Sequence, residues 1–192
     1  MLAYILWHRP RSGSAVRTMY EAGLLAFHEG LNKSNIPGFV RSSTHGVSPL
    51  PWLRENGCHE DWYLLSDWVA LGTLNEAAVQ GSHKTPHDLA AHSAVVEAGA
   101  LYSLKSGTPQ LDSPAALWFS KPDNMAYWVL WELLEPLTGP SSPCGIWQRQ
   151  LALGPAPEFC VLGEAELITD AFSVIRSKRT KIVNHTSLPL LH

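Results

Sequence analysis

The feature that most constrains this chain is an order of strand-like and helix-like segments that occurs in its first half and again in its second. Four apolar runs of the first half have the length and composition of strands: residues 2–9, 39–44, 60–66 and 99–105. A helix over residues 15–33 is predicted after the first run, because Tyr20, Leu24 and Phe27 recur at helical spacing. The first half therefore begins strand, helix, strand, strand.

Two helical segments are expected between the third and fourth strands. Asp67 is predicted as the N-cap of a helical run that passes through Leu74. Thr85 and Asp88 then have the spacing of a capping box, with Thr85 as the N-cap of a helix that ends near Ala98. The complete order of the first half is strand, helix, strand, strand, helix, strand.

The second half repeats this order in a shorter form. The predicted elements are a strand within residues 116–122, a helix, a hairpin at 145–153 with 158–162, and a last strand at 171–177. The helix carries Tyr127, Leu130, Trp131 and Leu134 on one stripe and is ended by Pro136 and Gly139. The spacing between matching residues shortens most where the first copy has its second helix. We therefore expect that helix to be reduced to a turn at residues 164–169. The alternative is chance similarity between apolar strands, because each single match is weak.

These segments describe two tandem βαββαβ units, the ferredoxin-like pattern, at residues 1–108 and 113–178, with a tail at 179–192. A tandem pair with strands as apolar as 2–7 and 62–65 resembles the dimeric α+β barrel superfamily, in which two four-stranded sheets pack face to face under outer helices. The resemblance implies an α+β fold in which one chain supplies both sheets. The expected architecture is a pseudo-dimeric α+β barrel whose second unit has a shortened second helix.

Composition narrows the class of protein further. The 192 residues are 45 % hydrophobic and 16 % charged, which is typical of a globular chain. A net charge of -3 gives no basic field for nucleic acid or an anionic membrane. We expect no membrane span, because no run of about 18 apolar residues occurs. The absence of a signal-peptide pattern and the three cysteines favour a cytoplasmic protein without a disulfide framework.

The resemblance implies a small-molecule pocket between the first sheet and its helices. We expect Trp7, Tyr20, Phe27 and Trp62 to bind the ligand there and His28 to act as a general base, since histidine is the side chain best suited to proton transfer near neutral pH. Such a site needs a cavity of roughly 300 Å³ or more beside His28. The alternative for His28 is a boundary histidine with one nitrogen in water.

Other polar and aromatic residues near strand ends have competing interpretations. Arg41 is assigned to the ligand site, but it could instead pair with Asp61 across a hairpin, because a buried charge needs a partner. Exposed strand ends would explain both residues equally well. His8 lies on the opposite face of the first strand from Trp7 and is expected to be partly solvated. Trp52 is expected to cover the fold rather than to act as a lid.

Metal and cofactor sites are not expected. His87 and His92 are five residues apart, which places them about 140° apart on a helix instead of on one face, and His83 precedes the predicted cap. Motifs for phosphate binding and for an activated nucleophile are lacking. The superfamily includes haem proteins with a ligand in their second unit, but residues 115–178 contain no histidine, which leaves His28 as the haem ligand to consider.

Three functions therefore stay open. The favoured one is a cofactor-free enzyme, monooxygenase-like or isomerase-like, that acts on a small apolar or aromatic compound. The second is a non-enzymatic interaction or scaffold protein whose aromatic residues form the core and an interface. The third is a haem-binding protein. A trimmed second unit would leave one flank of its sheet less covered, which predicts an association surface and a homodimer.

Overall fold

A computed structural model describes residues 1–11, 14–138, 143–152, 154–163 and 171–182. These residues form eight strands: β1 (Leu2–Pro10), β2 (Phe39–Val47), β3 (His59–Leu65), β4 (Ala94–Gly107), β5 (Ala115–Phe119), β6 (Gly145–Ala152), β7 (Phe159–Leu162) and β8 (Ile175–Lys181). They also form α1 (Ser14–Asn32), α2 (Trp68–Ala78), α3 (Lys84–Ser93) and α4 (Tyr127–Leu134), with short 3-10 helices at Gly81–His83 and Glu135–Leu137.

The strands close into one antiparallel barrel in the order β1-β3-β2-β8-β5-β7-β6-β4. The first half contributes the consecutive strands β4-β1-β3-β2, and the second half contributes β8-β5-β7-β6. Pairing of β2 with β8 and of β4 with β6 joins the halves. A closed barrel leaves no free strand edge to be protected. The predicted α+β barrel built by one chain is thus confirmed.

Side chains of successive residues in β1 and β3 point to opposite faces of the barrel wall. Trp7 and Trp62 are fully buried in the barrel interior, together with Trp118 and Trp147. In the register of the two strands, His8 pairs with His59, and Leu6 pairs with Asp61. These residues face the helices outside the barrel. The alternation therefore separates an aromatic interior from a polar cluster on the outer face.

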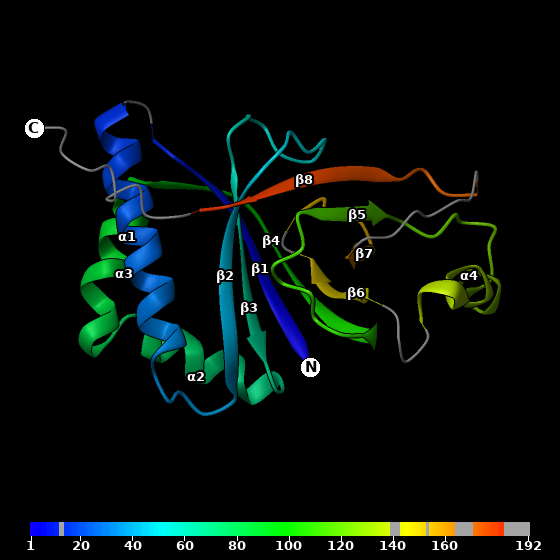
Figure 1. Cartoon of the computed structure of the whole chain (residues 1–192), viewed down its shortest axis with the longest axis horizontal. Coiled ribbons are helices and arrows are strands. Elements are labelled where there is room, and N and C mark those ends of the chain that lie inside the picture. The colour runs from blue at the N-terminus through cyan, green and yellow to red at the C-terminus, as the bar shows by residue number, and fades with distance from the viewer. Residues whose placement is uncertain (12–13, 139–142, 153, 164–170, 183–192) are drawn as a thin grey trace, which may run out of the picture.

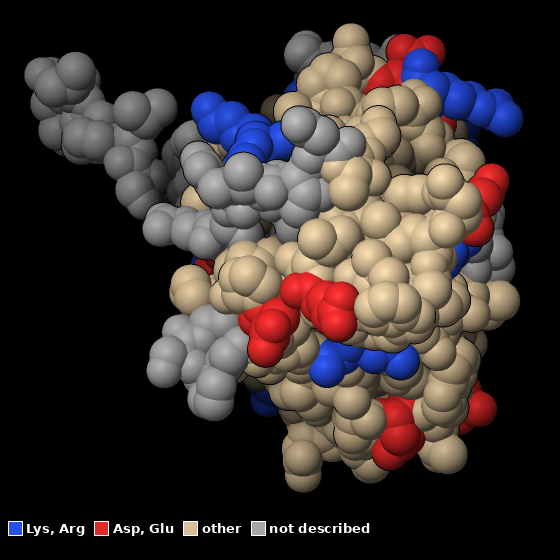
Figure 2. All heavy atoms as spheres, turned by 90° about the vertical axis from the view of Figure 1, so that its right-hand side faces the viewer, with Lys and Arg blue, Asp and Glu red and all other residues tan. Residues whose placement is uncertain are grey.

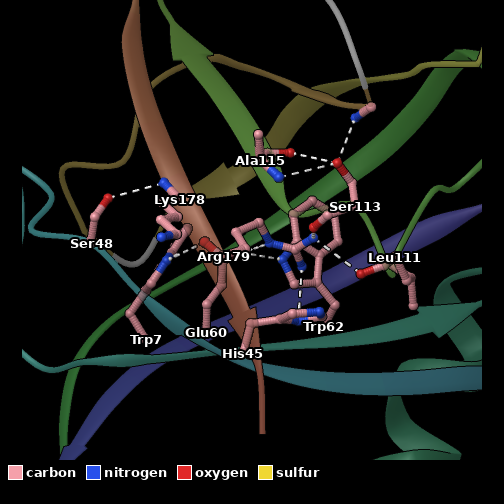
Figure 3. A network of polar contacts seen from close by, with 11 residues as sticks. Trp7, His45, Ser48, Glu60, Trp62, Leu111, Ser113, Ala115, Lys178 and Arg179 are labelled. Carbon is pink, nitrogen blue, oxygen red and sulfur yellow. Dashed lines mark hydrogen bonds and ion pairs between the residues drawn. The ribbon is translucent and has the colours of Figure 1, made fainter.

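A buried ion pair lies in the barrel interior (Figure 3). Glu60 accepts hydrogen bonds from the indole nitrogens of Trp7 and Trp62 at 2.9 and 2.8 Å, and from Nε of Arg179 at 2.9 Å. Neither Glu60 nor Arg179 exposes any of its side chain. Arg179 also donates to the carbonyl oxygens of Leu111 and Ser113. A charge without solvent needs such a set of partners, so this network joins β1, β3 and β8 in one register.

The helices cover the two halves of the barrel unequally. Figure 1 shows α1 and α3 side by side, with α2 near the lower end of the first sheet and α4 on the far side of the barrel. Figure 2 views the α4 side, where uncharged residues make up most of the surface. Tyr127 and Trp128 of α4 are exposed there, 48 % and 66 %. The association surface expected on this flank stays a prediction.

The loop after β2 has the structural role expected of it. Trp52 packs edge-on against Trp7 and Trp118, with ring centroids 5.9 and 5.4 Å apart. Leu50 of the same loop is 3 % exposed. The loop therefore extends the apolar core of the barrel.

The predicted capping box at Thr85 is wrong. A 3-10 turn over Gly81–His83 runs directly into α3, whose N-cap is His83, so Thr85 already lies inside the helix. Asp88 instead lies 2.5 Å from the ammonium of Lys84 one turn earlier. The helix also ends at Ser93 rather than near Ala98, because β4 begins at once and pairs with β1 along its length. Asp67 caps α2 as expected, accepting from two backbone N–H groups.

The last strand lies four residues later than predicted. The apolar run that suggested residues 171–177 includes Phe172 and Val174, which pack with the core under α4 instead. β8 carries Arg179 into the barrel interior, so a charged residue occupies a core position that an apolar pattern cannot reveal. Residues 179–181 therefore belong to the barrel and not to a tail. The turn predicted at 164–169 and the tail from 183 onward lie outside the described residues.

Among the described residues, no helix is long and apolar enough to cross a membrane.

The buried ion pair generates a stability prediction. Arg179→Met should lower the free energy of unfolding by about 3–5 kcal/mol, because it leaves the Glu60 carboxylate buried without a cation. The double variant Glu60→Gln, Arg179→Met should cost less than the two single variants added together. Urea denaturation measures all three. Arg176→Met, an exposed position on the same strand, is the control and should change stability by less than about 0.5 kcal/mol. Additive costs would show that the pair is not coupled.

Candidate functional site

A buried carboxylate on β3 organises the polar cluster outside the barrel. Asp61 is 1 % exposed. Its Oδ2 atom lies 2.8 Å from Nε2 of His8 and 3.2 Å from Nε2 of His28, and it accepts the hydroxyl hydrogen bond of Tyr63 at 3.0 Å. Its other oxygen, Oδ1, is also buried and has no hydrogen-bond partner among the described residues. The three contacts thus meet one carboxylate oxygen, and only that of Tyr63 has hydrogen-bond geometry, while the second oxygen has no partner in the described part of the chain.

Each of the two histidines also contacts a hydroxyl group through its other ring nitrogen, Nδ1. Nδ1 of His8 is hydrogen-bonded to the hydroxyl of Tyr20 on α1. Nδ1 of His28 lies 2.8 Å from Oγ of Ser42 on β2. Asn32, at the end of α1, holds the Ser42 backbone through two hydrogen bonds of 2.8 and 2.9 Å. The result is a chain of two arms, Tyr20–His8 and Ser42–His28, that share one carboxylate.

The partners fix the charge of Asp61. Burial alone would raise the pKa of its carboxyl, but the charges and hydrogen bonds of His8 and His28 outweigh burial and hold that pKa well below its ordinary value. Burial and the nearby Asp61 charge raise the pKa values of the Tyr63 and Tyr20 hydroxyls. Asp61 is therefore ionised and only accepts hydrogen bonds, so both histidine Nε2 atoms carry a proton toward it.

An apolar cavity reaches the Tyr20–His8 arm. It has a volume of about 220 Å³ and lies between β1, β3, α1 and α3. Its polar lining comes from His8, Tyr20, Asp61, Tyr63 and His87, and its remaining surface is largely apolar, with Leu24 and Ala90 as examples. We call this space the head chamber. The Tyr20–His8 arm, which can accept a proton, therefore ends at a largely apolar cavity.

Two further cavities adjoin the cluster. One of about 530 Å³ lies against α2 and shares Leu6, Phe27, Tyr63 and His87 with the head chamber. We call it the body chamber. Another of about 290 Å³ is lined by His28. The cavity beside His28 is therefore at the lower limit expected for a ligand site, and the larger cavity is not lined by His28.

The structure brings together only part of the predicted ligand site. Tyr20 and Phe27 line the head chamber. Trp7 and Trp62 lie in the barrel interior on the opposite face of the sheet, so the prediction that they share a pocket with Tyr20 is wrong. Strand alternation explains this, because each is the neighbour of a residue that faces the helices.

Arg41 and His28 are placed apart from the head chamber. Arg41 does not pair with Asp61; its guanidinium lies 2.6 Å from the carboxylate of Asp112, and both side chains are about half exposed. Arg41 and His28 both line the 290 Å³ cavity. His28 itself is 4 % exposed, so neither ring nitrogen is left to bulk water as the alternative interpretation had it.

Sequence reasoning missed His8 and Tyr63 and undervalued Asp61. His8 was expected to be partly solvated, but it is 3 % exposed because α1 covers the end of β1. The missed signal is the polar pair His8 and Asp61 on facing strands. In the β1–β3 register both side chains point to the same face of the sheet, and both are titratable.

The cluster does not fit a metal or a haem iron. No group of three or more ligating side chains within the described part of the chain could hold a metal ion. His28, the haem ligand considered from the sequence, has Nε2 on Asp61 and Nδ1 on Ser42. Neither nitrogen is left to coordinate iron without breaking the buried cluster.

Comparison with known proteins supports the fold. No protein-family model and no curated protein matches the sequence. A proposed monooxygenase from Fusobacterium nucleatum superposes with a TM-score of 0.61 at 8 % identity, over 95 % of this chain and 93 % of that one. A proposed chlorite dismutase superposes with a TM-score of 0.54 at 13 % identity, over 94 % and 95 %. The chain shares the α+β barrel fold of these two proteins. Its likeness to these barrels is one of fold alone, because the identities are low.

A second histidine next to the cluster generates a pH prediction. His59 is 2 % exposed, and its ring stacks on that of His8 at 5.9 Å. Burial, and then the charge of His8, lowers the pKa of His59 to about 4. Between pH 6.5 and 4 the unfolded chain therefore binds a proton that the folded chain does not. Stability should fall as pH decreases through this window, by up to about 1.4 kcal/mol per pH unit for this residue.

Urea denaturation of the wild type and of His59→Phe at pH 7, 5.5 and 4.5 tests this. The variant should lose less stability on acidification than the wild type. It should still lose some, because burial and Arg179 also lower the pKa of His45, to about 3. His92→Phe, at an exposed position, is the control and should follow the wild type. Parallel curves for wild type and His59→Phe would contradict the assignment.

Proposed function

We propose that this chain binds a small apolar or aromatic compound in the head chamber and removes a proton from it. The observation that carries the proposal is the Tyr20–His8–Asp61 chain, which ends at the wall of a largely apolar cavity. A buried histidine that faces a carboxylate on one side and a hydroxyl on the other is the arrangement of a general base. The low-dielectric surroundings strengthen the electrostatic part of that interaction.

The proposed proton transfer runs from the ligand through the Tyr20 hydroxyl to His8. In the neutral state, His8 carries its proton on Nε2, 2.8 Å from the Asp61 carboxylate, and accepts the hydrogen bond of the Tyr20 hydroxyl at Nδ1. When a ligand proton moves to the Tyr20 oxygen, the Tyr20 proton moves to Nδ1 of His8. The resulting imidazolium lies 2.8 Å from the Asp61 carboxylate, which stabilises it. The ligand is left as an anion, and the tyrosine is neutral again.

Hydrogen-bond partners favour His8 as the base and assign His28 a positioning role. The Ser42 hydroxyl has a second acceptor in Oδ1 of Asn32 at 3.4 Å, so it can accept a hydrogen bond from a charged His28. The Tyr20 hydroxyl has no second partner within the described residues, so it donates to His8. His28 is thus suited to hold positive charge beside Asp61, while His8 keeps the lone pair that accepts a proton. This replaces the catalytic role that the sequence gave to His28.

Two outcomes of proton removal fit this site. The anion can be reprotonated at another atom, as in an isomerase-like reaction, or it can react with dioxygen, as in a cofactor-free monooxygenase-like reaction. The fold neighbour proposed to be a monooxygenase supports the second. The isomerase-like outcome needs only the side chains of the cluster and the ligand, and the monooxygenase-like outcome also consumes dioxygen. Consumption of dioxygen by the complex would separate the two.

The domain organisation belongs to the same proposal. Read as strands one to four of each half, both halves have the neighbour order 4-1-3-2. This order supports two tandem ferredoxin-like units at residues 1–108 and 113–178, with β8 extending the second unit to 181. In the proposal only the first unit carries the polar cluster, because the corresponding outer face of the second unit is packed with Phe119, Phe159 and Leu130.

Proton removal can be followed with 2-naphthol, a planar aromatic alcohol whose ionised form absorbs at longer wavelength than its neutral form. The bound probe should ionise at lower pH than the free probe, because His8 and Asp61 stabilise the transferred proton. In His8→Gln the ionised fraction of bound probe at pH 7 should fall at least tenfold, since glutamine cannot take the proton. His92→Gln should behave as the wild type.

The location of the probe is tested with a matched pair of tryptophan substitutions. Ala91 is exposed at the wall of the head chamber, and Ala126 is exposed beside α4. Ala91→Trp should weaken 2-naphthol binding at least tenfold by filling the chamber, and Ala126→Trp should leave it within twofold. Absence of saturable binding to the wild type, or equal binding by both variants, would overturn the proposal.

A further inference from the structure

We infer that the two chambers form one elongated ligand site, which selects a compound with a hydrogen-bond donor at one end and an extended apolar body at the other. The inference rests on the proposed function for the role of the head chamber. It adds the class of ligand and a specificity-determining residue, Gly72.

The donor end follows from the open oxygen of Asp61. Oδ1 is buried and accepts no hydrogen bond from the described residues, while Oδ2 carries three contacts. A buried carboxylate oxygen without a donor is costly, so native structures supply a partner. Asp61 lines the head chamber, whose lining is otherwise largely apolar. In this inference, the donor that Oδ1 lacks is a ligand hydroxyl or N–H group at the Asp61 end of the chamber, close to the Tyr20–His8 arm.

The apolar end follows from the shape of the neighbouring space. Leu6, Phe27, Tyr63 and His87 border both chambers, so a ligand that enters one lies against the wall of the other. The head chamber, at about 220 Å³, is below the usual size of a ligand site, whereas the body chamber adds about 530 Å³. Tyr4, Leu71 and Leu74 give the body chamber an apolar surface. Asn75 and His87 also line it, and no Asp, Glu, Lys or Arg side chain does, which favours an uncharged ligand body.

Gly72 keeps the body chamber open. It lies in the middle of α2, where glycine is a poor helix former compared with alanine. A Cβ atom built there meets nothing within 4 Å, so neither packing nor backbone conformation requires a glycine. Gly72 also lines the body chamber. A side chain at this position would project into space that the ligand body needs. This requirement explains why a glycine is present at position 72.

The resulting ligand class is a hydroxylated or N–H-bearing compound with an uncharged apolar extension, such as a long alkylated or fused aromatic alcohol. The length of the body is the property that separates this inference from the proposed function, because proton removal needs only the head. Selectivity for length should therefore depend on Gly72 and not on His8.

Three probes test this: 2-naphthol, 6-hexyl-2-naphthol, and 6-hexyl-2-methoxynaphthalene, which lacks the donor. The wild type should bind 6-hexyl-2-naphthol at least tenfold more tightly than either of the other two. Gly72→Leu should remove the advantage of the hexyl group and leave 2-naphthol binding within twofold. Its melting temperature should equal or exceed that of the wild type, since leucine favours the helix. Glu76→Leu, which adds the same side chain at an exposed position of α2 outside the lining, should keep the advantage.

The outcomes separate the two proposals. If 2-naphthol binds and ionises but the hexyl group brings no gain, or Gly72→Leu keeps the gain, the two-chamber site is overturned and proton removal stands. If the methoxy probe binds as tightly as the alcohol, the donor role assigned to Oδ1 is overturned. If none of the probes binds in the head chamber, both proposals fail.

Discussion

Two neighbouring carboxylates on β3 are buried on opposite faces of one sheet, and each needs its own partners. Glu60 points into the barrel, where Arg179 and two indole N–H groups surround it. Asp61 points outward, where two histidines and a tyrosine meet one of its oxygens. Because an isolated buried charge is strongly unfavourable, these partners tie β1, β2, β3, β8 and α1 together. The rest of the fold is arranged around these two centres.

The two centres differ in what they leave free. Both carboxylate oxygens of Glu60 have donors, and its cation is an arginine that stays charged. Asp61 has titratable partners, an unfilled oxygen and a cavity beside it. The first centre is suited to hold the barrel in register, and the second is suited to accept and hold a proton. One strand therefore carries a structural carboxylate and a reactive one at adjacent positions.

Much of the fold could be predicted from the sequence, because strand and helix periodicity determine the order of elements. The apolar runs of β1 and β3, the stripe of α1 and the Asp67 cap are local signals, and the structure has all of them. β8 was misplaced because its inward residue is Arg179, whose burial depends on Glu60, far away in the sequence. The N-cap of α3 was predicted at Thr85 from a local motif. The preceding 3-10 turn leads directly into the helix, so the N-cap is His83 instead.

The candidate site was predicted less well, since it depends on which faces of which strands meet. Tyr20 and Phe27 could be found from the helical stripe, and His28 from its place beside that stripe. His8 and Asp61 become partners only through the β1–β3 register, and Ser42 reaches His28 only through the packing of α1 on β2. Trp7 and Trp62 were attractive as ligand residues because of their size. In a closed barrel, however, large inward-facing aromatic side chains form the core, so they do not line a pocket outside it.

The central claim is that His8 receives a proton when a ligand fills the head chamber. The most direct measurement is the ¹⁵N spectrum of the histidine side chains at pH 7, recorded with and without saturating 2-naphthol. We expect His8 to carry a proton on Nε2 alone in the free protein and on both nitrogens in the complex, with the probe ionised. A His8 side chain that stays neutral in a saturated complex would contradict it.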